Sequence, residues 1–113
     1  MDCIFCHIAT GKIPAEITYQ DEELIAFRDI NPQAPTHLLI IPKRHLPSLA
    51  QLSPADLPLI GRMVEVANKL AKEEGITETG YRLVVNYGEW GGQVMQHLHM
   101  HLLGGRKLTG RLG

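Results

Sequence analysis

Half of the six histidines in this chain lie within five residues, in the run His97-Leu98-His99-Met100-His101. They alternate with apolar residues, and a period of two is typical of a strand, whose successive side chains point to opposite faces. On a strand the three imidazoles share one face, about 7 Å apart, whereas a helix would turn His99 away from the other two. The run therefore predicts a strand over His97–Leu103 with three histidines on one side.

Three roles are open for such a face. The imidazoles could line a solvated sheet surface, or they could hold a catalytic metal, because H-x-H on a strand with one further histidine is a zinc-binding pattern. The third role is nucleophilic attack on phosphorus, since a neutral imidazole is a good nucleophile and can be oriented through its other ring nitrogen. The neighbouring histidines would then bind the phosphate or transfer protons.

The residues around the run favour attack on phosphorus. Gly91-Gly92 and Gly104-Gly105 bracket the histidines, and glycine lets backbone N–H groups approach an anion closely. Asn86 ends the preceding apolar segment beside the glycine-rich loop and offers a side-chain donor. Together these residues predict a phosphate-binding site.

The two cysteines, Cys3 and Cys6, form a C-x-x-C near the start of the sequence. A disulfide framework would need more cysteines. A thioredoxin-like motif would need a preceding strand, for which there is no room before residue 3. Spacing alone leaves zinc ligation and an unligated pair as alternatives.

The segments that must position these residues indicate an antiparallel sheet and one long helix. Short gaps rich in turn residues separate the first three apolar segments, whereas a parallel crossover would need a dozen or more residues. Ser53-Pro54 is a typical helix start and Gly75 a typical helix end. In chain order we expect a helical turn over 3–8, strands Ile17–Gln20, Leu24–Asp29 and Thr36–Pro42, the long helix, and strands Tyr81–Asn86 and His97–Leu103. The predicted fold class is α+β, with about five strands.

Apolar residues fill one half of the expected long helix, in two adjacent rows that begin at Leu57 and Leu59. Such a wide apolar face suggests burial against the sheet and a second contact, such as a subunit partner. Packing on the sheet alone explains it equally well.

Composition narrows the class of protein. With 113 residues and 44% hydrophobic content, we expect a single domain over residues 1–113. A formal net charge of -1 gives no global basic field, which argues against nucleic acid as a main partner. The sequence has no apolar run of about 18 residues and no secretory h-region, so we expect no membrane span and a cytoplasmic location.

Two long motifs resemble those of the histidine triad (HIT) family, specifically its Hint branch. One is Gly91-Gly92-Gln93-x-x-x-His97-Leu98-His99-Met100-His101-Leu102-Leu103-Gly104-Gly105-Arg106, and the other runs from Asp29 to His45 as DINPQAPTHLLIIPKRH. The resemblance implies a HIT-like fold, a five-stranded antiparallel sheet with one long helix and a short N-terminal helix. It also implies a homodimer whose two sheets join into one of ten strands, and hydrolysis of purine nucleoside phosphoramidates.

The resemblance further implies roles for individual residues. His99 would attack the α-phosphorus of a substrate such as adenosine 5′-phosphoramidate, giving a nucleotidyl-histidine that water hydrolyses. A backbone carbonyl would hold its other ring nitrogen, and His101, His37 and His97 would complete the catalytic set. The nucleotide-binding residues implied are Ile4, Phe5, Ile8, Phe27 and Ile30 around a purine of AMP or GMP type, Asp29 on the ribose, and Asn86, Gly92, Val94, His99 and His101 on the phosphate.

Many bacterial-type relatives carry an N-terminal C-x-x-C, and the resemblance implies a zinc ion held by Cys3, Cys6, His45 and His97. A Cys₂His₂ set is closed and therefore structural rather than catalytic. Such an ion would tie the N-terminal turn to the sheet, and no organic cofactor is expected.

Two features depart from well-studied animal members of the family. Val94 stands where those proteins carry a serine that is proposed to help the leaving group take a proton, and the tail Lys107–Gly113 lacks their aromatic residues. An alternative within the family is hydrolysis of dinucleoside polyphosphates, although that branch does not usually follow its triad with Gly104-Gly105-Arg106. A nucleotide-binding interaction module with little turnover is the alternative outside enzymes.

Overall fold

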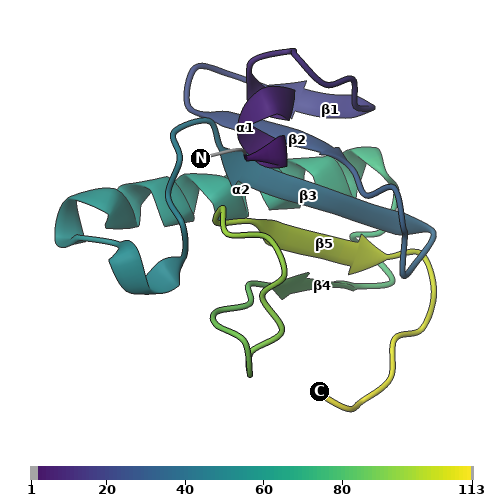
Figure 1. The fold of residues 1–113 in the computed structure, drawn as a ribbon. Coiled ribbons are helices and arrows are strands. Elements are labelled where there is room, and N and C mark those ends of the chain that lie inside the picture. The colour runs from purple at the N-terminus through teal and green to yellow at the C-terminus, as the bar shows by residue number, and fades with distance from the viewer. Residues whose placement is uncertain (1–2, 113) are drawn as a thin grey trace.

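The computed structural model describes residues 3–112, which form a five-stranded sheet, one long helix and a short N-terminal helix (Figure 1). The strands are β1 (Ile17–Gln20), β2 (Leu24–Arg28), β3 (Thr36–Pro42), β4 (Tyr81–Val84) and β5 (Met100–Gly104). The helices are α1 (Ile4–Ala9) and α2 (Leu57–Glu73), and two 3₁₀ turns, Leu49–Gln51 and Pro54–Asp56, lie between β3 and α2. Neighbouring strands are antiparallel in the order β1-β2-β3-β5-β4, so the predicted α+β class and antiparallel sheet are confirmed.

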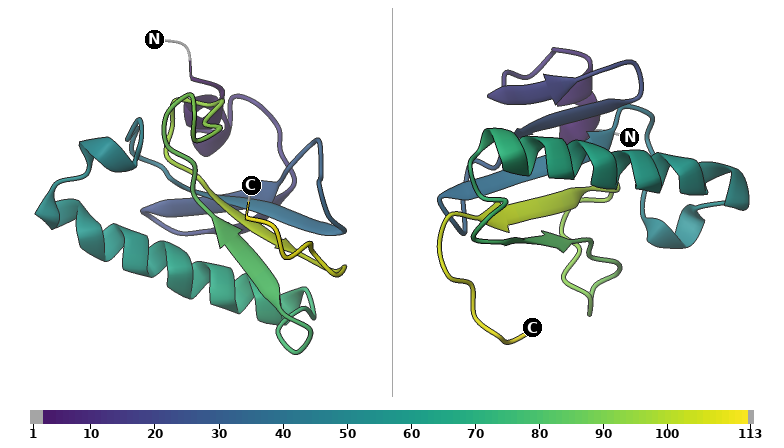
Figure 2. Two further views of the ribbon diagram at one scale, coloured as in Figure 1. Left: turned by 90° about the horizontal axis from the view of Figure 1, so that it is seen from below. Right: turned by 180° about the vertical axis from the view of Figure 1, so that it is seen from behind.

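The two helices lie on opposite faces of the sheet (Figure 2). Because both faces are covered, β3 is buried along its whole length, and its sequence is a continuous apolar run rather than an alternating one. Leu38 and Ile40 pack in the cluster beneath α2, whereas Leu39 and Ile41 pack in the cluster on the α1 face. Each buried Leu or Ile side chain contributes about 1.5–3 kcal/mol. The central strands therefore give the α1 face a firmly packed base.

The strand that carries the histidine run is shorter than predicted. β5 begins at Met100 rather than His97. The Leu98 N–H donates to the Leu46 carbonyl at 2.6 Å, outside the sheet, and β3 ends at Pro42, a residue type without an N–H to offer a neighbouring strand. The contact with the segment that follows β3 thus ends the ladder before it reaches the first two histidines.

The alternation predicted for the run nevertheless holds. Leu98 packs beneath α2 with Met100. The rings of His97 and His99 contact the ring of Phe5 from α1, on the other face, with centroids 5.9 and 5.3 Å away. The period of two therefore predicted the faces correctly and the strand boundary incorrectly.

The remaining boundaries shift by a few residues. β2 and β4 end before their predicted last residues, and the long helix begins after a 3₁₀ turn in which the Asp56 carboxylate accepts the Ser53 N–H at 2.9 Å. Gly75, with φ +73°, follows the last turn of α2 as predicted. In the part of the chain described, no helix combines the length and apolar character needed to cross a membrane.

Candidate active site

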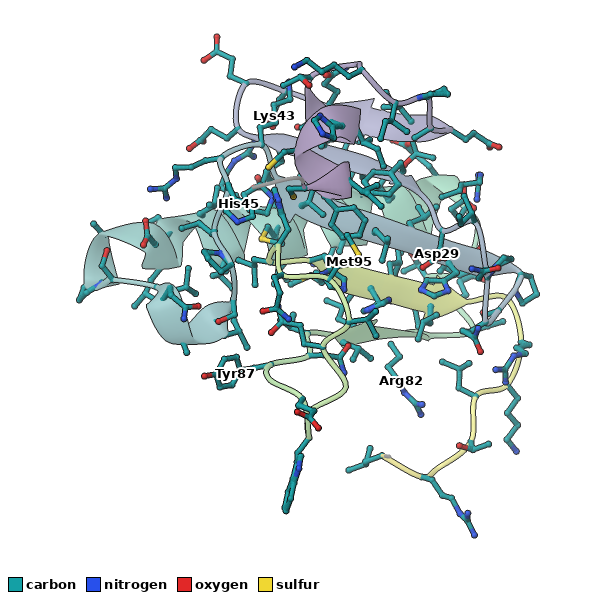
Figure 3. All side chains as sticks on the ribbon, in the orientation of Figure 1. Asp29, Lys43, His45, Arg82, Tyr87 and Met95 are labelled. Carbon is teal, nitrogen blue, oxygen red and sulfur yellow. The ribbon has the colours of Figure 1, made fainter. Side chains whose placement is uncertain are left out.

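A cavity of about 600 Å³ lies on the α1 face of the sheet. Its walls come from α1 and the segment after it, from β2, β3 and the loop between them, and from the segment between β4 and β5 together with the start of β5. Asp29 and Met95, which both line it, lie in front of the sheet on this face (Figure 3). The cavity brings together every residue predicted to bind nucleotide: Ile4, Phe5, Ile8, Phe27, Asp29, Ile30, Asn86, Gly92, Val94, His99 and His101.

One end of the cavity is an apolar slot. Phe5 and Phe27 are buried and meet edge-on, with ring centroids 5.5 Å apart. The segment between α1 and β1 adds three lining residues that the sequence did not single out, Ile13, Pro14 and Ala15. Ile30 is 92% exposed and forms part of the rim. A flat apolar ring is the chemistry that such a slot accepts.

His99 presents a free ring nitrogen to the cavity. Its Nδ1 lies 2.7 Å from the His97 carbonyl oxygen. A carbonyl only accepts, so Nδ1 must carry the proton and the lone pair of a neutral ring is on Nε2. His99 is buried, and the Phe5 ring lies edge-on to it. This is the orientation that a nucleophilic imidazole requires.

A chain of hydrogen bonds fixes the proton positions on His37 and His101. The backbone N–H of Gln33 donates to His37 Nδ1 at 3.0 Å, so the proton of neutral His37 is on Nε2. That Nε2–H faces His101 Nδ1 at 2.9 Å, which leaves His101 with an Nε2–H of its own. Burial lowers the pKa of both rings, that of His101 to about 4, so both are neutral near pH 7. His101 is thus a donor beside the His99 lone pair, with the two ring centroids 5.0 Å apart.

Asp29 lies at the end of β2 and keeps one carboxylate oxygen in the local backbone turn. Its Oδ1 accepts the Asn31 N–H at 2.8 Å, and Oδ2 lies 3.5 Å from His37 Nε2. Asp29, His37 and His101 are close enough to bind a metal ion. The 2.9 Å between the two ring nitrogens is a hydrogen-bond distance, however, and the hydrogen bond places a proton between them. The geometry at this point favours a hydrogen-bonded pair of rings over the catalytic metal that the H-x-H pattern left open.

The loop between β4 and β5 closes the other end of the cavity. Asn86 Nδ2 donates to the Gly91 carbonyl at 2.7 Å, which leaves its second N–H for a ligand. A side chain at Gly91 would collide with the Tyr87 carbonyl, and Gly92 has φ +81°. Both glycines are therefore required by the backbone conformation. Gly92 and the exposed Val94 line the cavity here.

The cysteines form a second cluster, next to the cavity, with His45 and His97. His97 Nδ1 lies 3.3 Å from Cys3 Sγ, 3.5 Å from Cys6 Sγ and 3.2 Å from His45 Nδ1, and His45 Nδ1 lies 3.3 Å from Cys6 Sγ. A tetrahedral ion with bonds of about 2.0–2.3 Å to nitrogen and sulfur separates its ligand atoms by about 3.3–3.8 Å. The observed spacing thus fits a zinc-sized ion.

The protonation pattern of this cluster also fits a cation. His97 Nε2 donates to the Pro42 carbonyl at 2.8 Å, so the Nδ1 that faces the cysteines carries a lone pair. A backbone partner of this kind orients metal-binding histidines in general. Burial, with the neighbouring Cys3, raises the pKa of the Cys6 thiol to about 11. Two thiolates here would need a positive charge between them.

His97 therefore joins two sites through different atoms. Its ring lies among the cysteines and does not line the cavity, while its carbonyl oxygen holds the ring of His99. From the sequence, His97 was predicted to be both a metal ligand and a member of the catalytic set. In the structure its side chain lies with the proposed metal ligands, and its backbone carbonyl contacts His99, the predicted nucleophile. Gln33 was missed because its contribution is a backbone N–H, which residue type does not reveal.

Comparison with known proteins identifies the family. Residues 2–111 match the family model described as scavenger mRNA decapping enzyme C-term binding. The purine nucleoside phosphoramidase of Escherichia coli K12 is 51% identical over 107 residues, which are 95% of this chain and 90% of that protein. The chain belongs to the histidine triad family.

Other histidine triad proteins match over nearly their whole length. Protein HitA of Neisseria gonorrhoeae is 48% identical over 91% of this chain and 95% of its own. The crystal structure of a HIT family hydrolase from Legionella pneumophila matches with a TM-score of 0.97 at 50% identity, over 99% of this chain and 100% of that one. A histidine triad protein from Clostridium difficile matches with a TM-score of 0.96 at 45% identity, over 98% and 96%. The HIT-like fold expected from the two motifs is therefore confirmed.

Proposed function

We propose that this histidine triad protein hydrolyses the phosphorus–nitrogen bond of purine nucleoside 5′-phosphoramidates. The observation that carries the proposal is the pairing of a lone pair on His99 Nε2 with a donor on His101 Nε2 in one cavity. A nucleophile beside a hydrogen-bond donor is what attack on a phosphoryl group requires. The Escherichia coli relative at 51% identity bears the name of this activity, which supports the proposal.

The cavity accommodates such a substrate in one direction. The purine lies in the apolar slot that Phe5 and Phe27 help to line. The ribose hydroxyls lie at the Asp29 carboxylate, since a carboxylate accepts hydrogen bonds from a diol. The α-phosphate then lies at the other end, between His99 and the loop that carries Gly92. Backbone N–H groups beside glycine bind such an anion well.

Two displacements at phosphorus complete the reaction. The His99 Nε2 lone pair attacks the α-phosphorus, the P–N bond breaks, and the departing amine takes a proton from solvent. His101 Nε2–H donates to a non-bridging oxygen and stabilises the charge that develops there. Water then attacks the same phosphorus, the bond to His99 breaks, and its electron pair returns to Nε2. The products are the nucleoside monophosphate and the amine, with the water protons released to phosphate and solvent.

We also propose a structural zinc ion on Cys3, Cys6, His45 and His97. The spacing of the four ligand atoms and the lone pair that Pro42 directs onto His97 Nδ1 support it. When bound, the ion supplies a fixed positive charge that holds both thiolates. The four ligands come from three parts of the chain: the N-terminal turn with α1, the segment after β3, and His97, whose carbonyl orients His99. Binding the ion would hold these parts together.

The decisive experiment compares the wild type with His99→Ala on adenosine 5′-monophosphoramidate, with release of AMP as the readout. We expect the variant to lose on the order of 10³-fold or more in kcat, because the proposed first step is attack by the His99 lone pair. Adenosine binding to the variant, measured by calorimetry, serves as the control for an intact cavity.

The outcomes separate the alternatives. Equal turnover by the two proteins would rule out His99 as the nucleophile. A folded wild type that binds AMP but turns over no phosphoramidate would point to a nucleotide-binding module. Turnover of diadenosine polyphosphates alone would move the protein to the other hydrolase branch.

A further inference from the structure

Gln93 is buried although its two neighbours in the chain, Gly92 and Val94, are exposed and line the cavity. Its own side chain does not line the cavity. A buried amide is stable only when its two N–H donors and its carbonyl oxygen find partners. The partners of Gln93 therefore show what the side chain does.

The amide of Gln93 joins three points of the backbone. Its Nε2 donates to the Pro47 carbonyl at 2.8 Å and to the Met95 carbonyl at 3.0 Å, and its Oε1 accepts the Gly88 N–H at 3.1 Å. Its backbone N–H donates to the Gly88 carbonyl at 3.0 Å. The side chain thus fastens both ends of the loop Gly88–Met95 to the segment that follows His45.

This loop has little other support. Trp90 at its tip is fully exposed, and Gly91 and Gly92 beside it are exposed as well. The Gly91 N–H donates to the Gly88 carbonyl at 3.2 Å, which closes the turn, and Asn86 Nδ2 donates to the Gly91 carbonyl at 2.7 Å, which ties the tip to the segment just after β4. Segments with few buried apolar contacts open most easily. The hydrogen bond from Gln93 to Pro47 therefore ties this loop to the segment after β3, and it restrains where Gly92 and Val94 lie.

We propose that Gln93 is a positioning residue for the phosphate group, acting through the backbone of Gly92–Val94. The inference rests on the proposed function, because it assumes that the α-phosphate binds at this loop. Gln93 does not touch the ligand. It fixes the loop at the spacing that lets backbone N–H groups bind the phosphate oxygens while His99 attacks the phosphorus.

The chemistry of the amide can be tested with a change of nearly equal shape. Gln93→Glu keeps the length of the side chain but replaces a two-proton donor with a carboxylate that faces two carbonyl oxygens. Gln96→Glu makes the same change on the same segment at an exposed position outside the cavity lining, and so is the matched control.

The experiment measures the dissociation constants of AMP and of adenosine, and kcat and KM, for the wild type and both variants. For Gln93→Glu we expect AMP affinity to fall about 10- to 100-fold, as for loss of hydrogen bonds to a charged group, and adenosine affinity to change less than about twofold. We expect a fall in kcat as well, while Gln96→Glu behaves as the wild type.

An equal loss of AMP and adenosine affinity in Gln93→Glu would overturn the proposal, because it would mean a general loss of structure. Unchanged AMP affinity and kcat would overturn it too. If the buried carboxylate prevents folding, Gln93→Met removes the same hydrogen bonds without a charge and is judged by the same ratio of affinities. A wild type that binds AMP no better than adenosine would instead contradict the proposed function.

Discussion

Three histidines of the site have one ring nitrogen fixed by a backbone group, and the ring of one of them, His37, in turn fixes His101. The His97 carbonyl holds His99, the Gln33 N–H holds His37, and the Pro42 carbonyl holds His97. Backbone groups do not titrate, so the proton positions that make one nitrogen a nucleophile and another a donor do not depend on a neighbouring charged residue. Residue type predicted which side chains carry the chemistry, and these backbone partners decide which atom of each does so.

At Asp29 we predict a loss that depends on the sugar. Asp29→Asn keeps an oxygen for the Asn31 N–H and removes the charge that would accept the ribose hydroxyls. Adenosine affinity should fall about 10- to 100-fold, since hydrogen bonds to a charged group contribute about 1.5–3 kcal/mol. Calorimetry with adenosine and with 2′,3′-dideoxyadenosine tests this. A matching loss for the dideoxy compound would show that Asp29 acts on the fold rather than on the diol.

Burial of His101 predicts a pH-dependent stability. Its pKa is lowered by burial to about 4, from an ordinary value of 6.5, while Asp29 opposes and His37 and His99 reinforce that shift. Between pH 6.5 and 4 the unfolded chain therefore binds more protons, so stability that is complete above pH 6.5 is lost as the pH falls. In His101→Gln the drop in unfolding free energy from pH 7 to pH 5 should be smaller by about 1–2 kcal/mol. Urea unfolding at the two pH values measures it, and equal drops in both proteins would contradict it.

The bounds of a helix or strand were predicted best where a residue that stops regular structure, such as proline, lies at each end of the segment. β3 has its predicted bounds, Thr36–Pro42, because a proline lies on each side of its apolar residues. The start of β5 was predicted three residues early, since the bond from Leu98 to Leu46 joins segments that sequence spacing does not relate.

The same distinction applies to the site. The side chains predicted for the site line one cavity. They could be predicted because the alternation of histidines with apolar residues shows which side chains share a face of the sheet, and the glycines show where the backbone turns. The slot residues Ile13–Ala15 and the amide of Gln93 were missed, because their roles depend on how loops fold over the sheet.

The proposed zinc site joins three elements, so its loss should loosen α1. Cys3 precedes that helix, and its Sγ accepts the Cys6 N–H at 3.3 Å. Cys3→Ser should lower Tm by on the order of 10 °C, as expected for the loss of about 2–3 kcal/mol in a domain of this size. A chelator should lower the Tm of the wild type by a similar amount and leave that of Cys3→Ser unchanged. A wild-type Tm that ignores the chelator, together with protein that contains no zinc by elemental analysis, would show that the four residues are unligated.

The β4 edge of the sheet lies near a row of α2 side chains that the core of the molecule covers only partly. β4 is the last strand beyond β5, and its residues are half-buried rather than buried. Ile60 and Val64 of α2 and Leu83 of β4 are likewise packed against the core but still partly exposed. An unpaired strand edge beside apolar side chains is a surface that proteins usually cover. A second copy would cover it by pairing β4 with β4, which extends the sheet to the ten strands expected from the family.

We therefore predict a homodimer that a charge in this row disrupts. Light scattering should give twice the chain mass for the wild type and the chain mass for Ile60→Lys at micromolar concentration, because a lysine there cannot be buried without a partner. Glu65→Lys, on the exposed side of the same helix, is the control. It loses only a surface pair with Arg62 and should stay dimeric. Circular dichroism of each variant distinguishes dissociation from unfolding. A monomeric wild type would mean that the wide apolar face of α2 serves its own sheet alone.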